Sequence, residues 1–241
     1  MEIACFDIAS AIKAAAAGAD RIELCDNAAE GGTTPSYGTL KKVKEIISIP
    51  IFPIIRPRGG DFLYSDEEYE TMLYDVQLCN DLGFDGVVFG LLNNIGSIDI
   101  KRTEQLVKAA GDMQVTFHRA FDRCNNPFHA LEALIYCGCK RILTSGQVPN
   151  AYDGKQLIEE LIEQAQNRII IMPGSGVRSI NIAELATYTG AKELHSSARK
   201  MQASDMLYTK VSMQESLDII SVDEEEIRKM KRALQVHDKH Q

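Results

Sequence analysis

The chain has 241 residues and a formal net charge of −8, and 45% of its residues are hydrophobic, which is an ordinary globular composition. The acidic balance and the lack of a lysine- or arginine-rich run argue against a nucleic-acid surface. No apolar run approaches the ~18 residues of a membrane span. The segment Met1–Asp7 has neither the basic region nor the long apolar core of a signal peptide, so we expect a cytoplasmic protein.

Strand and helix patterns alternate along the whole chain. Apolar runs and period-two alternation predict strands over residues 2–6, 21–25, 51–55, 86–89, 115–118, 141–144, 169–172 and 193–197. Helical periodicity and capping residues predict helices over residues 7–18, 36–47 (beginning at Thr34 or Ser36), 65–83, 99–110, 127–138, 153–166 and 180–188. An irregular stretch, 199–221, precedes a last helix over 223–236.

The number of these units indicates the fold. Strands that alternate with helices imply a parallel sheet, and eight such units in this length imply a closed (β/α)8 TIM-like barrel of the α/β class. No break in composition divides the chain, so we expect one domain over residues 1–241. An open doubly wound sheet is the alternative, but the chain has neither a GxGxxG nor a Walker fingerprint to support it.

In such barrels the active site lies at the carboxyl ends of the strands. If Val115 and Phe117 face the helices, then Thr116 and His118 point into the barrel, because neighbouring side chains of a strand alternate. The same alternation predicts that several more polar residues point inward, namely Glu2, Glu23, Cys25, Glu193 and His195.

Strands one, two and eight are neighbours in a closed barrel, so Glu2, Glu23 and Glu193 are expected close together. Three buried carboxylates need cations or shared protons. Two interpretations stay open, namely a structural ion network with arginines, or a polar catalytic or metal-binding centre with His118 and His195. In the catalytic version His118 is the general acid or base, Glu23 or Glu193 is its partner, and Asp122 either orients His118 or caps the next helix.

Other groups near the mouth suggest an anion. Small residues after the seventh and eighth strands expose backbone N–H groups at the usual barrel phosphate site, although glycines also simply turn a loop. Arginines near the strand ends would clamp a carboxylate or phosphate. The candidate anion-binding residues are Arg56, Arg58, Arg119, Ser145, Gly174, Gly176, Ser196 and Ser197.

Several of these segments resemble the CutC copper-homeostasis family. The resemblance extends in order from Glu2 to Ala198 and rests on Arg21–Cys25, Glu30–Ser36, Pro53–Phe62, Thr116–Asp122, Leu143–Gly146 and Glu193–Ser197. It implies a cytoplasmic TIM-like barrel that forms a homo-oligomer, is linked to copper tolerance and binds a copper ion. The segment after Arg199 carries no diagnostic motif.

Cu(I) prefers thiolate and thioether donors, but few of the six cysteines are positioned to serve as its ligands. They form no CxxC pair and are expected to be reduced and mostly structural. Cys25 is placed at the mouth and Cys124 in the loop that follows the fifth strand, so these two are the candidate metal ligands. Three hypotheses follow: a copper-binding homeostasis protein, an enzyme that uses histidine acid–base chemistry on a small anionic or phosphorylated metabolite, and a barrel that only senses a ligand.

Overall fold

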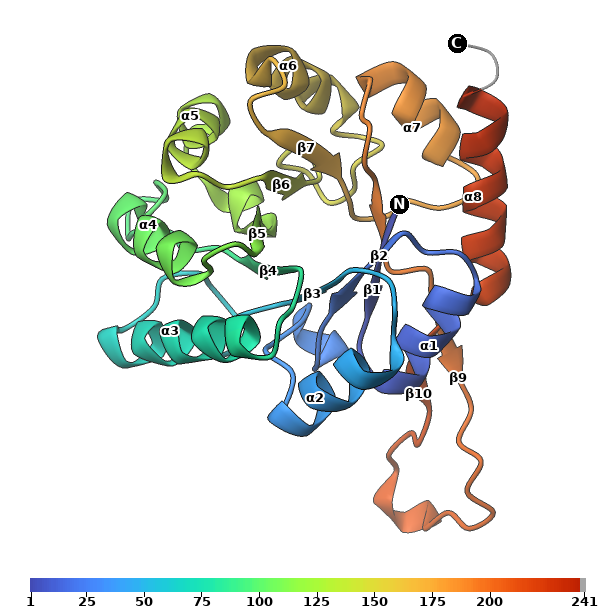
Figure 1. Cartoon of the computed structure of the whole chain (residues 1–241). Coiled ribbons are helices and arrows are strands. Elements are labelled where there is room, and N and C mark those ends of the chain that lie inside the picture. Colours follow the sequence, from blue (N-terminus) through green and yellow to red (C-terminus); the bar gives the residue numbers. More distant parts are fainter. Residues whose placement is uncertain (239–241) are drawn as a thin grey trace.

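A central ring of parallel strands is enclosed by helices in the computed structural model, which describes residues 1–238 (Figure 1). Within these residues the ring strands are β1 Glu2–Cys5, β2 Arg21–Leu24, β3 Ile51–Pro53, β4 Gly86–Phe89, β5 Gln114–Phe117, β6 Arg141–Thr144, β7 Ile170–Pro173 and β8 His195–Ser196. The helices are α1 Ile8–Ala16, α2 Tyr37–Ile46, α3 Asp66–Asp81, α4 Ile100–Ala109, α5 Pro127–Cys137, α6 Lys155–Ala165, α7 Ile182–Thr189 and α8 Glu224–Asp238.

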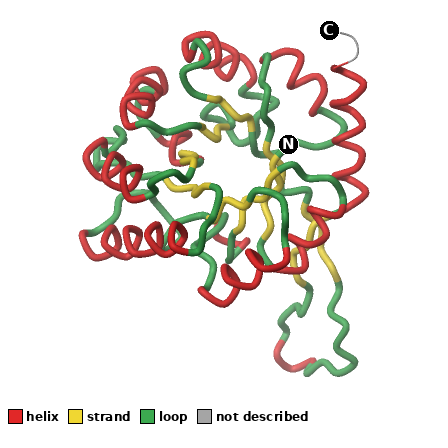
Figure 2. Tube along the Cα trace, in the orientation of Figure 1, coloured by secondary structure: helices red, strands yellow, loops and turns green. Residues whose placement is uncertain are grey.

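Hydrogen-bonded ladders order the strands as β3-β2-β1-β8 and β4-β5-β6-β7. The two groups meet where Ile54 bridges to Val88, and the Ile55 N–H donates to the Val88 carbonyl oxygen at 2.7 Å. Glu2 pairs with His195, which brings the last barrel strand beside the first. The predicted (β/α)8 barrel is confirmed, and Figure 2 shows its strands as a ring inside the helices.

Short-range signals fix where the helices begin. Ser65 and Glu68 form the predicted capping box at the start of α3, and Asp7 accepts a hydrogen bond from the Ser10 N–H at the start of α1. Each such cap satisfies N–H groups that have no partner inside the helix and contributes ~1 kcal/mol. Because each of these helices follows a strand, its start lies on the side of the barrel where the strands end.

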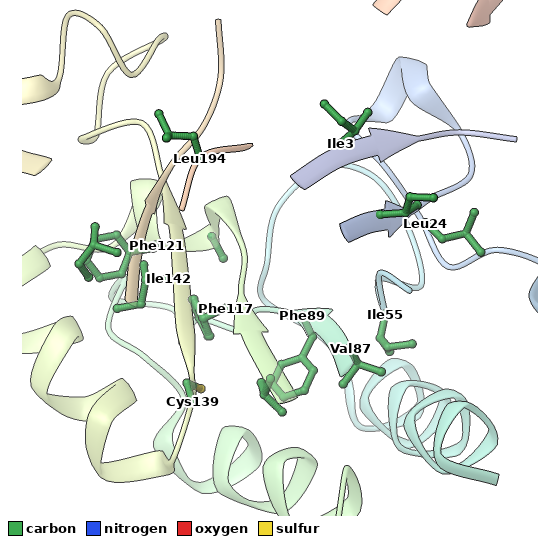
Figure 3. Close-up of a cluster of buried hydrophobic side chains, with 14 of the residues drawn as sticks. Ile3, Leu24, Ile55, Val87, Phe89, Phe117, Phe121, Cys139, Ile142 and Leu194 are labelled. Carbon is green, nitrogen blue, oxygen red and sulfur yellow. The ribbon is translucent and has the colours of Figure 1, made fainter. Parts of the chain in front are cut away.

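Side-chain alternation sorts the strand residues into two cores. Apolar residues that face the helices form the large outer core, which includes Ile3, Leu24, Phe117, Ile142 and Leu194 (Figure 3). A small inner cluster holds Cys25, Phe52, Ile54 and Val88. The predicted parity of strands one, two, five and eight agrees with this division, so the polar residues between these apolar ones point into the barrel.

The segment predicted to be irregular contains an antiparallel ribbon. The strands β9 Arg199–Gln202 and β10 Ile219–Val222 pair with each other, and the chain between them extends away from the barrel (Figure 1). After this excursion α8 packs against α7 and α1 and completes the helix ring. Among residues 1–238, no helix combines the length and apolar character that crossing a bilayer requires.

Candidate functional site

A cavity of about 1010 Å³ opens at the carboxyl ends of the strands. Several of the residues predicted for the site line it, namely Glu23, Arg56, His118, Arg119, Gly176, His195 and Ser197. They come from five different strands or the loops that follow them, which is how a barrel assembles a site from distant parts of the sequence. Arg123, Arg178 and Arg199 also line the cavity and were not predicted.

The deepest polar group of the cavity is a carboxylate–histidine–carboxylate set. Glu2 Oε1 lies 2.7 Å from His195 Nδ1, and the other ring nitrogen, Nε2, lies 3.8 Å from Glu23 Oε2. All three side chains are buried, although Glu23 and His195 border the cavity. The contact with Glu2 fixes the orientation of the imidazole and leaves Nε2 on the side of Glu23.

Opposing shifts in pKa follow from this arrangement. Burial acts to raise the pKa of Glu2, but the hydrogen bond to His195 and the charge of Arg21 outweigh it and lower the value to about 2. Burial acts to lower the pKa of His195, but Glu2 and Glu23 outweigh it and raise the value. Burial raises the pKa of Glu23. Glu2 is therefore a fixed anion at neutral pH, whereas the pKa values of His195 and Glu23 are both raised from their usual values.

Glu193 does not line the cavity, in contrast to its predicted role beside the histidines. Its carboxylate lies 2.6 Å from Arg21 Nη2 and 2.6 Å from Arg141 Nε, and both guanidinium groups lie over the Phe52 ring. Arg21 also contacts Glu2 Oε2 at 2.5 Å, so one arginine joins the two carboxylates. The structural ion network and the histidine centre, which were alternatives in the sequence, are thus adjacent parts of one arrangement.

His118 lies at the carboxyl end of β5 and is neutral at physiological pH. Burial and then the charge of Arg56 lower its pKa to about 3. Its Nδ1 accepts a hydrogen bond from the Ala120 N–H at 3.1 Å, which is possible because Gly90 leaves room for the ring. An imidazole whose pKa is lowered to about 3 and whose basic nitrogen already accepts a hydrogen bond is a weak proton acceptor, so the predicted general-base role does not suit it.

Asp122 does not orient His118 either. It pairs with Arg119 at 2.7 Å and accepts hydrogen bonds from Thr144 Oγ1 and the Ser145 N–H. Arg119 Nη2 in turn donates to Ser145 Oγ at 2.8 Å. Ser145 is fully buried and does not line the cavity, so it positions Arg119 through this hydrogen bond without contacting the cavity itself. This group joins the ends of β5 and β6 and directs one arginine toward the mouth.

Arg56 brings a positive charge to the cavity, and no acidic side chain of residues 1–238 forms an ion pair with it. The side chain is 5% exposed, and its hydrogen bonds go to the backbone oxygens of Glu30, Gly32 and Gly60 at 2.6, 2.9 and 2.9 Å. Because these partners are neutral, an anion in the cavity would meet a desolvated guanidinium. Arg58 lies elsewhere: past Pro57 it turns outward and pairs with Glu68 at 2.5 Å.

Of the residues predicted to bind an anion in the loops after β7 and β8, some line the cavity and others only support the loops. Gly176 and Ser197 line the cavity, as do Ser175, Val177 and Arg178. Gly174 instead packs against Leu143 and His195, and Ser196 Oγ donates to the Val177 carbonyl oxygen at 2.7 Å. Gly176 has a φ of +70° and sits so close to Asn150 that an added Cβ would lie 2.9 Å from that side chain. These residues shape a loop that also contributes Arg178 to the cavity lining.

The two predicted copper ligands are not brought together. Cys25 belongs to the inner cluster, whereas Cys124 packs into the outer core near Gln147. Burial raises the pKa of Cys25 well above its usual value and that of Cys124 to about 11, so both are neutral thiols at pH 7. Cu(I) binds thiolate, and within residues 1–238 no group of three histidine, cysteine or acidic side chains is placed to hold a metal. Cys25 and Cys124, which lie in different clusters, therefore do not form a two-cysteine copper site as the structure places them.

Comparison with known proteins gives a consistent family. The CutC family model matches residues 1–200. A family protein CutC of Photorhabdus laumondii is 52% identical over 218 residues, which are 90% of this chain and 87% of that protein. A crystal structure of a proposed copper homeostasis protein CutC from Streptococcus agalactiae has a TM-score of 0.78 and 34% identity, over 81% of this chain and 97% of that chain. The aldolase QR15, at 14% identity and a TM-score of 0.62 over 82% of this chain and 89% of its own, shares the fold alone.

Proposed function

The chain belongs to the CutC family, and on that premise we propose that it is a barrel enzyme that moves protons on a small anionic metabolite. One observation carries the proposal. A buried Glu2–His195 pair, 2.7 Å apart, presents the other imidazole nitrogen toward Glu23 at the wall of a cavity that also contains the positive charge of Arg56. Displaced pKa values beside a desolvated cation are typical of acid–base sites.

The roles follow from the contacts. Glu23 accepts a proton from the substrate, and His195, protonated on both nitrogens, delivers one from Nε2. Transfer of a proton from Glu23 to His195, which lie 3.8 Å apart and must come within hydrogen-bond distance or share one water, restores the starting state. Glu2 remains ionised and holds the imidazolium, as the buried acid does in other carboxylate–histidine pairs. Arg56, with Arg119 and Arg178 nearer the mouth, binds the anionic part of the substrate.

A role in copper homeostasis is part of this proposal, because the Streptococcus agalactiae relative is described by it. We infer that the connection runs through the reaction and its metabolite rather than through a Cu(I)–thiolate site. The neutral, separated thiols of Cys25 and Cys124 support this inference. Cytoplasmic location is proposed on similar grounds, since the six cysteines are all unpaired.

Self-association is the remaining proposal. The chain between β9 and β10 carries apolar side chains that are at least 60% exposed, namely Met206, Leu207, Tyr208, Val211 and Met213. Exposed apolar patches of this kind are typical of interfaces, so we propose that this arm contributes to a homo-oligomer.

Turnover measured in D₂O tests the enzymatic proposal. The protein is incubated with a panel of small phosphorylated and carboxylated metabolites, and ¹H NMR follows the exchange of carbon-bound hydrogens. We expect exchange with at least one compound, and a loss of about 10²- to 10⁴-fold in Glu23→Gln because the proton acceptor is gone. Glu45→Gln makes the same chemical change on the exposed surface of α2 and serves as the matched control. Equal rates in Glu23→Gln and the control contradict the assignment.

A further inference from the structure

His118 occupies the cavity wall as a neutral hydrogen-bond donor rather than a base. Its Nδ1 accepts from the Ala120 N–H, so the proton of the neutral ring resides on Nε2. That Nε2–H has no hydrogen-bond partner among the described residues, and the side chain is 4% exposed. Buried donors nearly always have partners, and one left unsatisfied at the wall of a cavity points to a ligand atom. Because the neutral His118 ring donates from Nε2 and has little tendency to take up a proton, an oxygen atom of a ligand is a suitable acceptor.

The surroundings of His118 indicate which kind of oxygen it would bind. The Phe62 ring lies 5.0 Å from the imidazole, centre to centre, and 5.1 Å from the Arg56 guanidinium carbon, so one aromatic ring touches both. The imidazole is thus shielded from water and lies close enough to Arg56 for the positive charge of Arg56 to lower the pKa of His118. Desolvated donors aimed at a site strongly favour an oxygen that gains negative charge during a reaction. A carbonyl oxygen that becomes an enolate is such an oxygen.

We propose that His118 Nε2–H donates to the carbonyl oxygen of the substrate and stabilises it as the enolate forms. This rests on the proposed function, because Glu23 is the base that removes the proton. The C–H bond next to the carbonyl breaks, its electron pair forms the carbon–carbon double bond, and the carbonyl π electrons move to the oxygen. The removed proton resides on Glu23, and the His118 proton stays on Nε2. The substrate class is therefore a small aldehyde or ketone with an adjacent C–H and an anionic group held by Arg56.

A neutral donor suits this step better than an imidazolium. An imidazolium would protonate the oxygen and then be left to regain its proton, whereas a neutral imidazole only strengthens its hydrogen bond as charge develops. The charge of Arg56 and the burial of the ring keep His118 in the neutral state over the whole physiological range. The site thus contains two histidines with different tasks, a proton donor at position 195 and a hydrogen-bond donor at position 118.

The first test observes the imidazole in the wild-type protein. Long-range ¹H–¹⁵N correlation spectra of ¹⁵N-histidine-labelled protein report which ring nitrogen carries the proton between pH 5 and 8. We expect His118 to remain an Nε2–H tautomer throughout this range. A proton on Nδ1 of His118, or titration of His118 within this range, would overturn the proposal.

The second test measures binding of 2-phosphoglycolate, which resembles a phosphorylated enediolate, by calorimetry at pH 7.5. We expect binding to the wild-type protein, weakening of about 10- to 100-fold in His118→Phe, and a smaller loss in His118→Gln, whose amide keeps a donor. Inorganic phosphate, which lacks the carbonyl-derived oxygen, should bind all three proteins equally, and this also shows that the variants are folded. Unchanged 2-phosphoglycolate affinity in His118→Phe, or no binding to the wild type, refutes the proposal.

The two proposals fail separately. If Glu23→Gln exchanges carbon-bound hydrogens as fast as its control while 2-phosphoglycolate still requires His118, the proton-transfer function is wrong and the donor site stands. If Glu23→Gln abolishes exchange and His118→Phe leaves both exchange and binding unchanged, the function stands and the role of His118 is wrong.

Discussion

Glu2→Gln should destabilise the barrel in a way that depends on pH. Glu2 is a fully buried side chain that contacts both His195 and Arg21. The substitution keeps the shape of the side chain but removes the negative charge between two cations. Breaking a buried ion pair by removing one partner leaves an uncompensated buried charge, which typically costs 3–5 kcal/mol.

The pKa of Glu2 gives an independent magnitude and the pH range. Its value falls from 4.5 to about 2 in the folded protein, which corresponds to about 3 kcal/mol of stability at neutral pH. Because the folded pKa is the lower one, this stability is fully present above pH 4.5 and is lost as the pH falls toward 2. The raised pKa of His195 describes the same ion pair, so it is counted once. Its sign is opposite: that stability is present below pH 6.5 and is lost as the pH rises through the folded pKa.

Urea unfolding followed by circular dichroism, at half-unit steps between pH 3 and pH 7, measures the effect. The expected difference in unfolding free energy between wild type and Glu2→Gln is about 3 kcal/mol at pH 7 and about half that at pH 3. Glu132→Gln is the matched control, because Glu132 also has a pKa lowered to about 2, by Arg168 first, but its side chain is 45% exposed. Solvent screening should limit that loss to below about 1 kcal/mol. A loss in Glu2→Gln no larger than in Glu132→Gln, or a loss independent of pH, refutes the reasoning.

Three further predictions concern the loops, the thiols and the arm. Gly176→Ala should lower the unfolding free energy measured in urea by about 1–2 kcal/mol and weaken inorganic phosphate binding in calorimetry, because the φ of Gly176 is +70° and Asn150 occupies the space of a Cβ. Gly83→Ala is the control, because its φ of +72° causes the same backbone strain but the space around it is open. It should leave phosphate binding intact. The Cys25→Ser, Cys124→Ser double variant should match the wild type in a bicinchoninate competition assay for Cu(I), and a tenfold loss of affinity would restore a thiolate site. Replacing residues 204–217 by a short turn should leave the melting temperature unchanged and reduce the sedimentation coefficient by more than the lost mass explains. A reduction explained by the lost mass alone would show that the arm has no role in assembly.

Local patterns were sufficient for the barrel but not for the details of its rim. Alternation along β2 and β5 predicted which side chains point inward, because a strand leaves a side chain only two choices. The ribbon of β9 and β10 was missed because its strands are short, β9 is largely exposed, and β10 is buried only at the adjacent residues Ser221 and Val222, which gives no alternating pattern. Arg178 and Arg199 line the cavity although no spacing marks them, and their only sequence signal is that each follows a glycine- or serine-rich strand end.

The roles of the two histidines depend on contacts that no sequence pattern contains. His118 and His195 both occur near the ends of predicted strands, at positions whose side chains point into the barrel. The sequence pattern alone therefore cannot distinguish their roles. One lies beside Arg56 and gives its Nδ1 to a backbone N–H, and the other lies between Glu2 and Glu23. Those neighbours come from strands that are distant in the sequence, and they displace the two pKa values in opposite directions.

The strongest argument that the cavity is catalytic is that polar groups lacking full partners lie beside the Glu2–His195–Glu23 set. A purely structural ion network needs a cation against each carboxylate, and Arg21 and Arg141 already supply this for Glu2 and Glu193. Nothing in that network requires a neutral imidazole whose Nε2 has no partner among residues 1–238, nor a buried Arg56 that forms no ion pair with an acidic side chain of those residues. Unsatisfied His118 Nε2 and unneutralised Arg56 both lower stability in the free protein, since each is desolvated without full compensation. An anionic substrate with a carbonyl group would satisfy both at once.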